Sequence, residues 1–581
     1  MPRPRATAVV CSLGSIILLL SSVALYASPQ MPAGAGATAT LTVSLAGSGK
    51  GSVSSTPAGI NCPGSCSASF SAGTQVTLIE TPAQGSTSAG LSEGDCNGNG
   101  DSCTLTLQSD KHLVANFGGY SLNSINHIIY MAQENRSLDH YFGELRAYWA
   151  ANNIPDQSFD GLPQFNPKTG PPPLYKPPPT NPGCDPADQK WCEVDSKSPK
   201  VTSYKLITEC LENPGDEWSQ SLTDRNLKEP LSATALMNGL VWTSADYARI
   251  VKFYDVDGIR SMGYYDGSDL NYYYFMATAF ATSDRWFSPV MTRTPSNREY
   301  LDAATSQGYV HTLTYKDPPL SAEPIFEALQ NAGITWKIYV NPQGSSCTGP
   351  PYDPKCLLGL SSIQVFQFGQ TIPTKYPNNI APISEYFTDL QNGTLPQVGE
   401  IEEASDAGLD EHPSDSDTAM TNIQKGANYV STLINGLMSS SSWTDSAFIL
   451  TYDEFGGVYD HVPPQPTVNP DGIKPRDLRS HDVCHPPEKG PVCDFVYTGY
   501  RMPLIVVSPF TKQNYVSHTV ADTTAILKFI ETRFNIAPLT KRDAAQMDMT
   551  EFFDFTNPPW LTPPNPPVQS LSGPCYQNHL P

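Results

Sequence analysis

The sequence predicts an α/β protein with a mainly parallel central sheet, preceded by a small all-β domain. From about residue 122 onward, short apolar strands alternate with amphipathic helices. Residues 38–118 contain only short alternating strands, and no linker divides residues 122–560. We therefore expect a leader at residues 1–27, a β domain at 38–118, a large α/β domain at 122–560 and a C-terminal tail at 561–581.

The composition of this 581-residue chain excludes global disorder and disfavours nucleic acid as a partner. Hydrophobic residues make up 39% of the chain, and its 42 glycines and 54 prolines stay below the share typical of low-complexity sequences. The chain has 57 acidic and 35 basic residues, for a net charge of −22. Such a chain repels nucleic-acid phosphates, although it can bind a phosphate substrate where a cation is held.

The first 27 residues predict a secretory signal peptide. Arg3 and Arg5 precede an uncharged stretch from Ala6 to Ala27, which is the pattern of an export signal. The alternative is an uncleaved anchor helix, because the stretch is long enough to span a bilayer. Both interpretations predict a protein that is secreted or held in the cell envelope.

Twelve of the thirteen cysteines follow this leader, and most have a near neighbour in sequence. Examples are Cys62 with Cys66 and Cys484 with Cys493. Short loops of this kind are typical of disulfides in exported proteins. Zinc is the alternative, but the spacings are not those of zinc knuckles, so we expect disulfides whose pairing the sequence leaves open.

The predicted β domain contains four strands with alternating polarity, at residues 40–45, 74–79, 103–107 and 112–117. The spacing of Gly51, Gly59, Cys62, Cys66 and Gly73 within it resembles the bacterial repeat domain of the internalin B-repeat kind. That resemblance implies association with the cell surface and no chemistry of its own.

The larger domain contains continuous apolar strands between helices. We expect strands at residues 126–131, 334–340, 447–452 and 504–507, and helices at 323–333 and 523–535. Strands without alternation are typical of a parallel sheet that helices cover on both faces.

Two polar clusters follow two of these strands, at residues 133–143 and 451–464. Open α/β sheets bind ligands beyond the carboxyl ends of their strands, so both clusters are expected at one edge. Their Glu-Asn and Asp-Glu pairs supply oxygen ligands suited to Mg²⁺, Ca²⁺ or Mn²⁺, with Zn²⁺ as a further option. The alternative is that each acid is a turn residue or a helix cap.

Five motifs in this domain resemble a known family. They are Glu134–Gly143, Thr292–Leu301, Asp410–Pro413, Tyr452–Pro464 and Gly499–Pro509. Their order and residues resemble the bacterial phosphoesterase family that includes the non-haemolytic phospholipases C and the respiratory-burst-inhibiting acid phosphatases. The resemblance spans residues 124–556 and implies an alkaline-phosphatase-like sandwich.

The resemblance also implies site residues. The divalent metal ligands would be Glu134, Asn135, Asp453 and Glu454. Thr294 matches the nucleophile that becomes phosphorylated. A bound metal would make this hydroxyl nucleophilic by lowering its pKa.

The remaining matched positions concern the phosphate group. Asn297 and Arg298 would hold phosphate oxygens, and His412 and His461 would protonate the leaving oxygen. His140 would also lie at the substrate, with a structural histidine as the alternative.

The chain departs from the family pattern at two points. The family's Thr-x-Pro-Asn-Arg reads Thr294-Pro295-Ser296-Asn297-Arg298, so Ser296 is a rival nucleophile, although the Asn-Arg alignment favours Thr294. Residues 210–219 contain no histidine where the family has a histidine-rich segment. The second departure bears on substrate identity and pH optimum more than on the reaction.

These observations predict a secreted, metal-dependent phosphoric ester hydrolase that acts through a phospho-threonine, with phospholipids among its substrates. Phospholipase C and acid phosphatase activities stay open as alternatives. A choline pocket would need an aromatic cage, for which tyrosines at 264–265 and 272–274 are one option and core packing the other. The rival class is a non-catalytic surface-binding protein.

Overall fold

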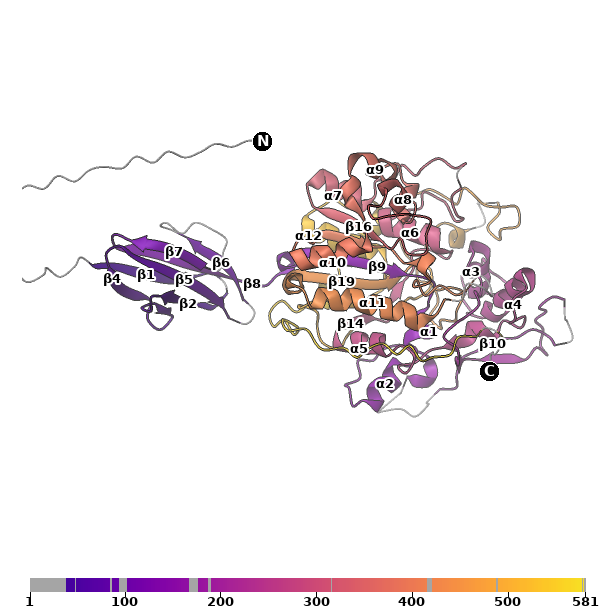
Figure 1. Cartoon of the computed structure of the whole chain (residues 1–581). Helices are drawn as coiled ribbons and strands as arrows, with labels where there is room; N and C mark the ends of the chain where they lie inside the picture. The colour runs from indigo at the N-terminus through magenta and orange to yellow at the C-terminus, as the bar shows by residue number, and fades with distance from the viewer. Residues whose placement is uncertain are drawn as a thin grey trace, which may run out of the picture. The chain divides into compact units, whose positions relative to one another are not determined.

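Two folded units follow one another along the chain, one ending at Gly118 and the other beginning at Gly119 (Figure 1). The structure, a computed structural model, describes residues 38–576 and 578. Within that range it omits residues 48, 84–85, 93–101, 167–175, 187–189, 315, 415–420 and 487–489. The expected signal peptide lies outside the described residues.

The N-terminal unit consists of two four-stranded sheets. One sheet has the order β4 (Ser67–Ser71), β1 (Thr38–Ala46), β8 (Lys111–Gly119) and β6 (Ser86–Ser92). The other has the order β3 (Asn61–Cys62), β2 (Gly51–Thr56), β5 (Thr74–Pro82) and β7 (Ser102–Leu107). Alternate residues such as Leu41 and Val43 of β1 and Val76 and Leu78 of β5 are buried, as period-2 strands require. The four predicted strands are therefore confirmed.

The second unit is built on an eight-stranded sheet. Its order is β17 (Ile380–Pro382), β16 (Trp336–Val340), β18 (Val398–Ile401), β9 (His127–Gln133), β19 (Ser446–Tyr452), β20 (Ile505–Val507), β14 (Ala281–Ser283) and β21 (Tyr515–Ser517). The five strands from β17 to β19 are parallel, whereas β20 runs antiparallel to both of its neighbours. The predicted α/β class with a mainly parallel sheet is confirmed.

Helices cover both faces of this sheet. In Figure 1, α10 (Ile383–Asn392) and α11 (Ile423–Met438) lie in front of it, and α12 (Thr524–Phe534) lies behind it. On the side of α12, this helix packs against α6 (Thr294–Ala303), which also contacts α7 (Ile325–Ala332). The buried residues of α11 recur every three or four positions, so one face of the helix meets the sheet.

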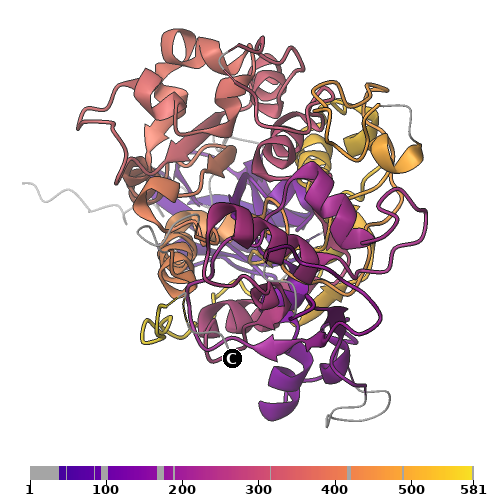
Figure 2. The same cartoon turned by 90° about the vertical axis from the view of Figure 1, so that its right-hand side faces the viewer.

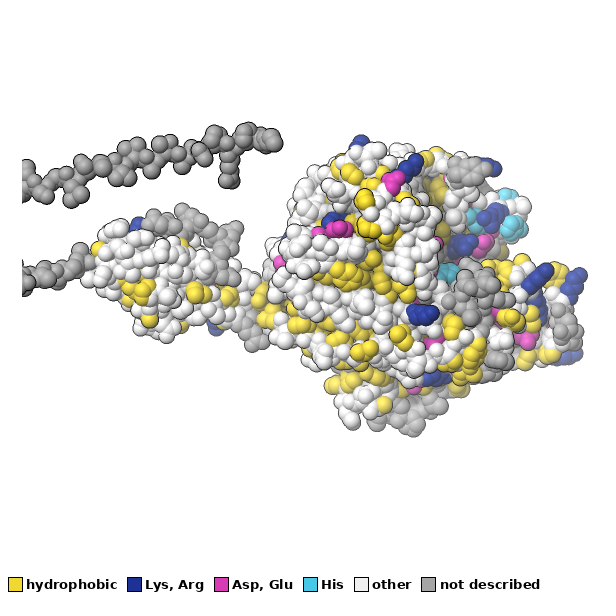
Figure 3. Space-filling view, in the orientation of Figure 1, with side chains coloured by type: hydrophobic (Ala, Val, Ile, Leu, Met, Phe, Trp, Pro, Cys, Tyr) yellow, Lys and Arg dark blue, Asp and Glu magenta, His cyan; other side chains and the backbone are white. Residues whose placement is uncertain are grey.

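The strands β9, β18 and β19 end on the side that Figure 2 shows. There the segments between about residues 180 and 270, which include α3 (Trp218–Arg225) and α4 (Leu240–Val251), lie in front of the sheet. Charged side chains are sparse over the face in Figure 3, and lysines, arginines and histidines gather toward the right-hand side, where the strands end. Basic groups thus lie on that side although the net charge is −22.

Five disulfides join cysteines of the described residues. Four close short loops: Cys62–Cys66, Cys184–Cys192, Cys347–Cys356 and Cys484–Cys493. The fifth joins Cys210 to Cys575 across 365 residues and attaches the C-terminal segment to the rest of the second unit. Among the described helices, none combines the length and the apolar character that crossing a membrane requires.

Candidate active site

Three neighbouring parallel strands deliver acidic residues to one edge of the sheet. Glu134 and Asn135 follow β9, and Asp453 and Glu454 follow β19, whose Tyr452 pairs with Gln133 of β9. The backbone N–H of Asn135 donates to Asp453 Oδ1 over 3.0 Å, so the two predicted clusters meet. On the other side of β9, β18 is followed by Glu402 and Glu403.

The backbone after these strands is adapted to close approach. Asn135 has a φ of 60°, in the left-handed region that asparagine tolerates better than most residues. Gly456 also has a positive φ, and a Cβ there would lie 2.2 Å from the carbonyl oxygen of Asn135. Its N–H donates to Glu454 Oε2 over 2.7 Å. A glycine is therefore required where the second cluster turns over the first.

Thr294 is the first residue of α6, and its hydroxyl reaches the first cluster. Thr294 Oγ1 lies 2.8 Å from Glu134 Oε2 and 3.1 Å from Asn135 Oδ1. The rival hydroxyl of Ser296 is fully buried and donates to the carbonyl oxygen of Tyr309 over 3.1 Å. Of the two hydroxyls, only that of Thr294 contacts the acidic residues in the described structure.

The predicted metal ligands suit a divalent cation. Asp453 Oδ2 and Glu454 Oε1 are buried oxygens without a hydrogen-bond partner among the described atoms. Buried carboxylate oxygens are usually paired or coordinate a metal. Together with the Glu134 and Asn135 oxygens around Thr294, they form the oxygen-rich donor set that Mg²⁺, Ca²⁺ or Mn²⁺ prefers.

The pKa values of these carboxyl groups reflect their crowding. Burial raises the pKa of Asp453 well above its usual range, and the neighbouring Glu134 adds to that effect. Burial likewise raises the pKa of Glu454, with further contributions from Asp216 and Asp453. Burial would also raise the pKa of Glu134, but Arg298 and His412 outweigh it, so that pKa is lowered. Crowded acids of this kind ionise together only when a cation offsets their charge.

Arg298 lies one turn after Thr294 on the same face of α6 and supplies positive charge at the other oxygen of Glu134. Its Nη2 lies 2.7 Å from Glu134 Oε1, and its Nη1 lies 2.7 Å from Glu403 Oε2. The guanidinium thus joins the acids that follow β9 to those that follow β18.

The comparisons with known proteins identify the family. The model of the Phosphoesterase family matches residues 125–537, which is most of the chain. The chain belongs to the Phosphoesterase family. It is a hydrolase that acts on phosphoric esters.

Several phospholipases C are similar to this phosphoesterase. Phospholipase C B of Mycobacterium tuberculosis is 27% identical over 466 residues, covering 76% of this chain and 80% of the relative. Non-hemolytic phospholipase C of Burkholderia pseudomallei is 27% identical over 500 residues, covering 79% and 63%. Non-specific phospholipase C3 of Arabidopsis thaliana is 25% identical over 466 residues, covering 76% of each chain.

Solved structures match at low overall similarity. A protein of the alkaline phosphatase superfamily from Vibrio parahaemolyticus has a TM-score of 0.29 and 11% identity, covering 70% of this chain and 78% of its own. Murine ectonucleotide pyrophosphatase / phosphodiesterase 5 has a TM-score of 0.26 and 12% identity, covering 46% and 91%. The family match begins at residue 125, after the N-terminal β domain, so the resemblance of that domain to a bacterial repeat stays a prediction.

The structure gives Asn297 and His140 protein partners. The Asn297 side chain accepts from the N–H of Val290 at 3.0 Å and donates to the carbonyl of Thr292 at 2.6 Å, so it braces the loop that precedes Thr294. His140 is buried, with Nδ1 2.8 Å from the carbonyl oxygen of Gly263 and Nε2 3.1 Å from Arg136 Nη1. The contacts of His140 correspond to the alternative of a structural histidine. A hydrogen bond from Asn297 to a substrate would have to replace one of its hydrogen bonds to the backbone.

The two remaining histidines lie in different surroundings. His412 is close enough to Glu134 for its charge to lower the pKa of that carboxyl group. His461 instead contacts Asp139, with Nδ1 2.7 Å from Oδ2. Among the described residues, Asp139, Asp460 and His461 form a group whose ligand-type atoms lie within 4.8 Å of one another.

Arg501 already pairs with both carboxylates of this group. Its Nη2 lies 3.0 Å from Asp139 Oδ1, and its Nε lies 2.8 Å from Asp460 Oδ1. A fixed guanidinium that pairs with both carboxylates disfavours a second cation there. We therefore interpret Asp139, Asp460, His461 and Arg501 as a buried ion-pair network.

Sequence reasoning missed three acidic residues and one arginine of this site. Asp216 accepts from Asn135 Nδ2 over 2.7 Å, which directs the amide oxygen of Asn135 toward Thr294. Asp216 lies in the segment that lacks the family's histidine. The missing histidine was therefore the one feature of the sequence that could have pointed to Asp216. Arg293, next to Thr294, lies 3.4 Å from Glu217 and is held near Asp216 and Glu454.

Glu402 and Glu403 were missed for a different reason. They follow β18, a strand of only four residues that contains a glycine and a glutamate. That stretch has neither the length nor the apolar run that made β9 and β19 recognisable.

Proposed function

We propose that this phosphoesterase cleaves phosphoric esters through Thr294, with a divalent metal held by Glu134, Asn135, Asp453 and Glu454. The observation that carries the proposal is the contact of the Thr294 hydroxyl with Glu134 and Asn135, at 2.8 and 3.1 Å. Beside it lie Asp453 and Glu454 oxygens that have no hydrogen-bond partner among the described atoms. When bound, the metal would lower the pKa of the hydroxyl and offset charge on the phosphoryl oxygens.

Thr294 acts as the nucleophile in this proposal. Its hydroxyl passes its proton toward the Glu134 carboxylate, which Arg298 and His412 keep ionised. Thr294 Oγ1 forms a bond to phosphorus while the bond from phosphorus to the ester oxygen breaks, and the alcohol leaves. Water then attacks the phosphorus of the phospho-threonine, and the bond from phosphorus to Thr294 Oγ1 breaks. This step restores the hydroxyl and releases phosphate from a monoester substrate or a phosphate monoester from a diester substrate.

His412 is the better placed of the two histidines to protonate the leaving oxygen. It lies close enough to Glu134 to lower the pKa of that carboxyl group. Its Nδ1 faces the carbonyl oxygen of Pro413, so Nε2 is the atom that would deliver the proton. His461 contacts carboxylates through both ring nitrogens, at 2.7 Å to Asp139 and 3.3 Å to Asp160. We therefore assign proton donation to His412.

The relatives support a phosphodiester substrate. Those named above are phospholipases C, which act on the phosphodiester of a phospholipid. Five disulfides among the described residues support export, because disulfides persist in oxidising compartments. We propose that the enzyme meets its lipid substrate outside the cytoplasm, with the β domain contributing to association with the cell surface.

Metal analysis of the Asp453→Asn variant tests the proposal. The purified wild-type enzyme should carry bound divalent metal, whereas Asp453→Asn should lose most of it and at least about a hundredfold in activity. Asp257→Asn is the matched control, since the Asp257 side chain is 71% exposed. Undiminished metal and activity in Asp453→Asn would contradict the ligand assignment.

A further inference from the structure

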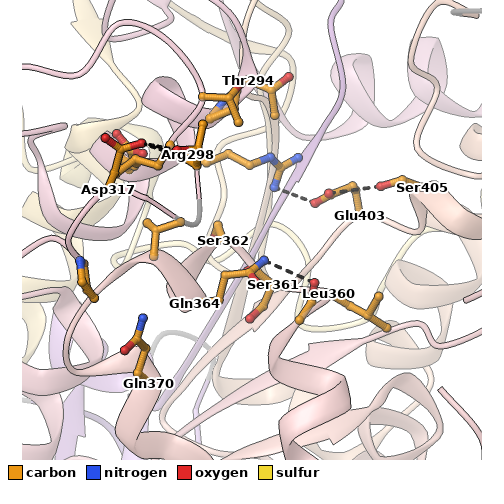
Figure 4. Close-up of a pocket in the computed structure, with 18 of the residues that line it drawn as sticks. Thr294, Arg298, Asp317, Leu360, Ser361, Ser362, Gln364, Gln370, Glu403 and Ser405 are labelled. Carbon is orange, nitrogen blue, oxygen red and sulfur yellow. Dashed lines mark hydrogen bonds and ion pairs between the residues drawn. The ribbon is translucent and has the colours of Figure 1, made fainter. Parts of the chain in front are cut away.

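A pocket of about 770 Å³ opens beside the nucleophile. Thr294 and Arg298 line one end of it, and Figure 4 shows Gln370 at the far end from Thr294. A volume of this size accommodates a phosphoryl group together with an organic substituent. The chemistry of the walls therefore bears on which substituent the enzyme accepts.

The walls do not suit a quaternary ammonium group. Among the described residues that line the pocket, none is aromatic, and a choline group is bound through aromatic faces. The clustered tyrosines lie in the core instead: the Tyr273 hydroxyl donates to Glu411 over 2.6 Å, and the Tyr265 hydroxyl donates to the carbonyl of Thr208 over 2.9 Å. Core packing is thus the interpretation that holds for Tyr265 and Tyr273.

The walls do not suit a second phosphate either. Arg298 is the only cationic side chain among the described lining residues, and Glu134 and Glu403 already pair with it at 2.7 Å each. The pocket also contains Asp317 and Asp406. A polyphosphorylated substituent would face these carboxyl groups without a free cation.

The remaining polar wall consists of hydroxyl and amide groups. Hydroxyls come from Thr312, Thr314, Ser361, Ser362 and Ser405. Amides come from Asn341, Gln364 and Gln370. Figure 4 shows several of these side chains around the same space, with Ser405 bonded to Glu403. Thr314, Ser361, Ser362 and Ser405 already donate their hydroxyl protons within the protein, so toward a ligand they act as acceptors. The Thr312 hydroxyl and the Gln370 amide supply donors. Such a wall matches hydroxyl groups, which both donate and accept, and carboxylates add acceptors for vicinal hydroxyls.

We propose that this pocket binds an uncharged polyhydroxylated substituent of the phosphoric ester, of the glycerol, sugar or cyclic polyol class. The proposal rests on the proposed function, because it concerns the group attached to the phosphorus that Thr294 attacks.

Water-soluble dihexanoyl phospholipids, used as monomers with the full-length enzyme, test the proposal. The phosphatidylinositol and phosphatidylglycerol forms should show kcat/KM at least about tenfold above the phosphatidylcholine form, as expected from one or two added hydrogen bonds. Phosphatidylmethanol has the same charge as the polyol esters but no hydroxyls, so it should rank with phosphatidylcholine. Phosphatidylethanolamine tests whether the acids select an ammonium group instead.

A pair of glutamine variants locates the effect in the pocket. Gln370→Leu should lower the ratio of kcat/KM for the inositol ester to that for the methyl ester about fivefold or more. Gln367→Leu is the control, because Gln367 is exposed nearby in the chain but does not line the pocket, and it should leave both values unchanged.

The outcomes separate this proposal from the proposed function. Hydrolysis of all esters with choline, ethanolamine or methyl forms equal to or above the polyol forms would overturn the pocket assignment and leave the hydrolase intact. An unchanged ratio in Gln370→Leu would also overturn it. Absence of hydrolysis of every ester would overturn the proposed function, and the pocket assignment with it.

Discussion

The ion pair between His461 and Asp139 makes the stability of the catalytic domain depend on pH. The two side chains meet at 2.7 Å, and that of His461 is only 17% exposed. Burial by itself lowers the pKa of His461, but the Asp139 carboxylate outweighs it and raises the pKa from 6.5 to about 9. The folded protein therefore binds this proton more tightly than the unfolded chain does.

The sign and the size of the effect follow from that difference. A raised pKa contributes stability that is fully present below about pH 6.5 and is lost as the pH rises through about 9. The difference, 9 − 6.5 = 2.5 pKa units, corresponds to about 3 kcal/mol of unfolding free energy.

Urea unfolding at about pH 6 and about pH 9.5 measures this contribution. All eight tryptophans lie between residues 149 and 560, so their fluorescence reports on the catalytic domain and not on the β domain. The stability difference between wild type and His461→Asn should shrink by about 3 kcal/mol from the lower to the higher pH. The exposed His481→Asn control should show no such change. An equal or larger difference at the higher pH would refute the ion-pair reasoning.

Three further predictions concern the rival nucleophile, the disulfides and the domain boundary. Ser296→Ala should retain activity within about tenfold in a steady-state assay, because Ser296 only donates to the carbonyl of Tyr309; loss on the scale of Thr294→Ala would contradict this. Thiol titration of the exported protein in denaturant without reductant should find few or no free thiols, because the cysteines of the described residues are disulfide-bonded; six or more would contradict the prediction. Removal of residues 28–120 should leave hydrolysis of a small soluble ester largely intact, whereas a folded but inactive product would mean that the β domain completes the site.

The parts of the fold that the sequence predicts are those with long, uninterrupted apolar runs. β9 and β19 are buried along nearly their whole length, so they stand out in the sequence, and the acids that follow them could be expected at one edge. β18 contains a glycine and a glutamate among its four residues, and β14 consists of Ala-Thr-Ser. Neither has an apolar run, so tertiary pairing alone makes them strands. For that reason Glu402 and Glu403 were not predicted.

Contacts between distant loops could not be predicted from local pattern. Asp216 lies in an irregular segment, and its role depends on meeting Asn135, 81 residues away in the sequence. The Cys210–Cys575 disulfide likewise depends on the path of the C-terminal tail, which no local spacing encodes. The role of Asn297 also needed the structure, because its amide meets the backbone of its own loop.

The covalent intermediate on Thr294 is the central claim, and mass spectrometry of enzyme quenched in acid during turnover tests it most directly. The account predicts a phosphate or phosphodiester adduct on the peptide that contains Thr294, located on Thr294 itself, and its absence in Thr294→Ala, which should lose at least about a hundredfold in activity. Thr294→Ser should retain activity, since it keeps the hydroxyl. An adduct on Ser296, or full activity in Thr294→Ala, would contradict the account.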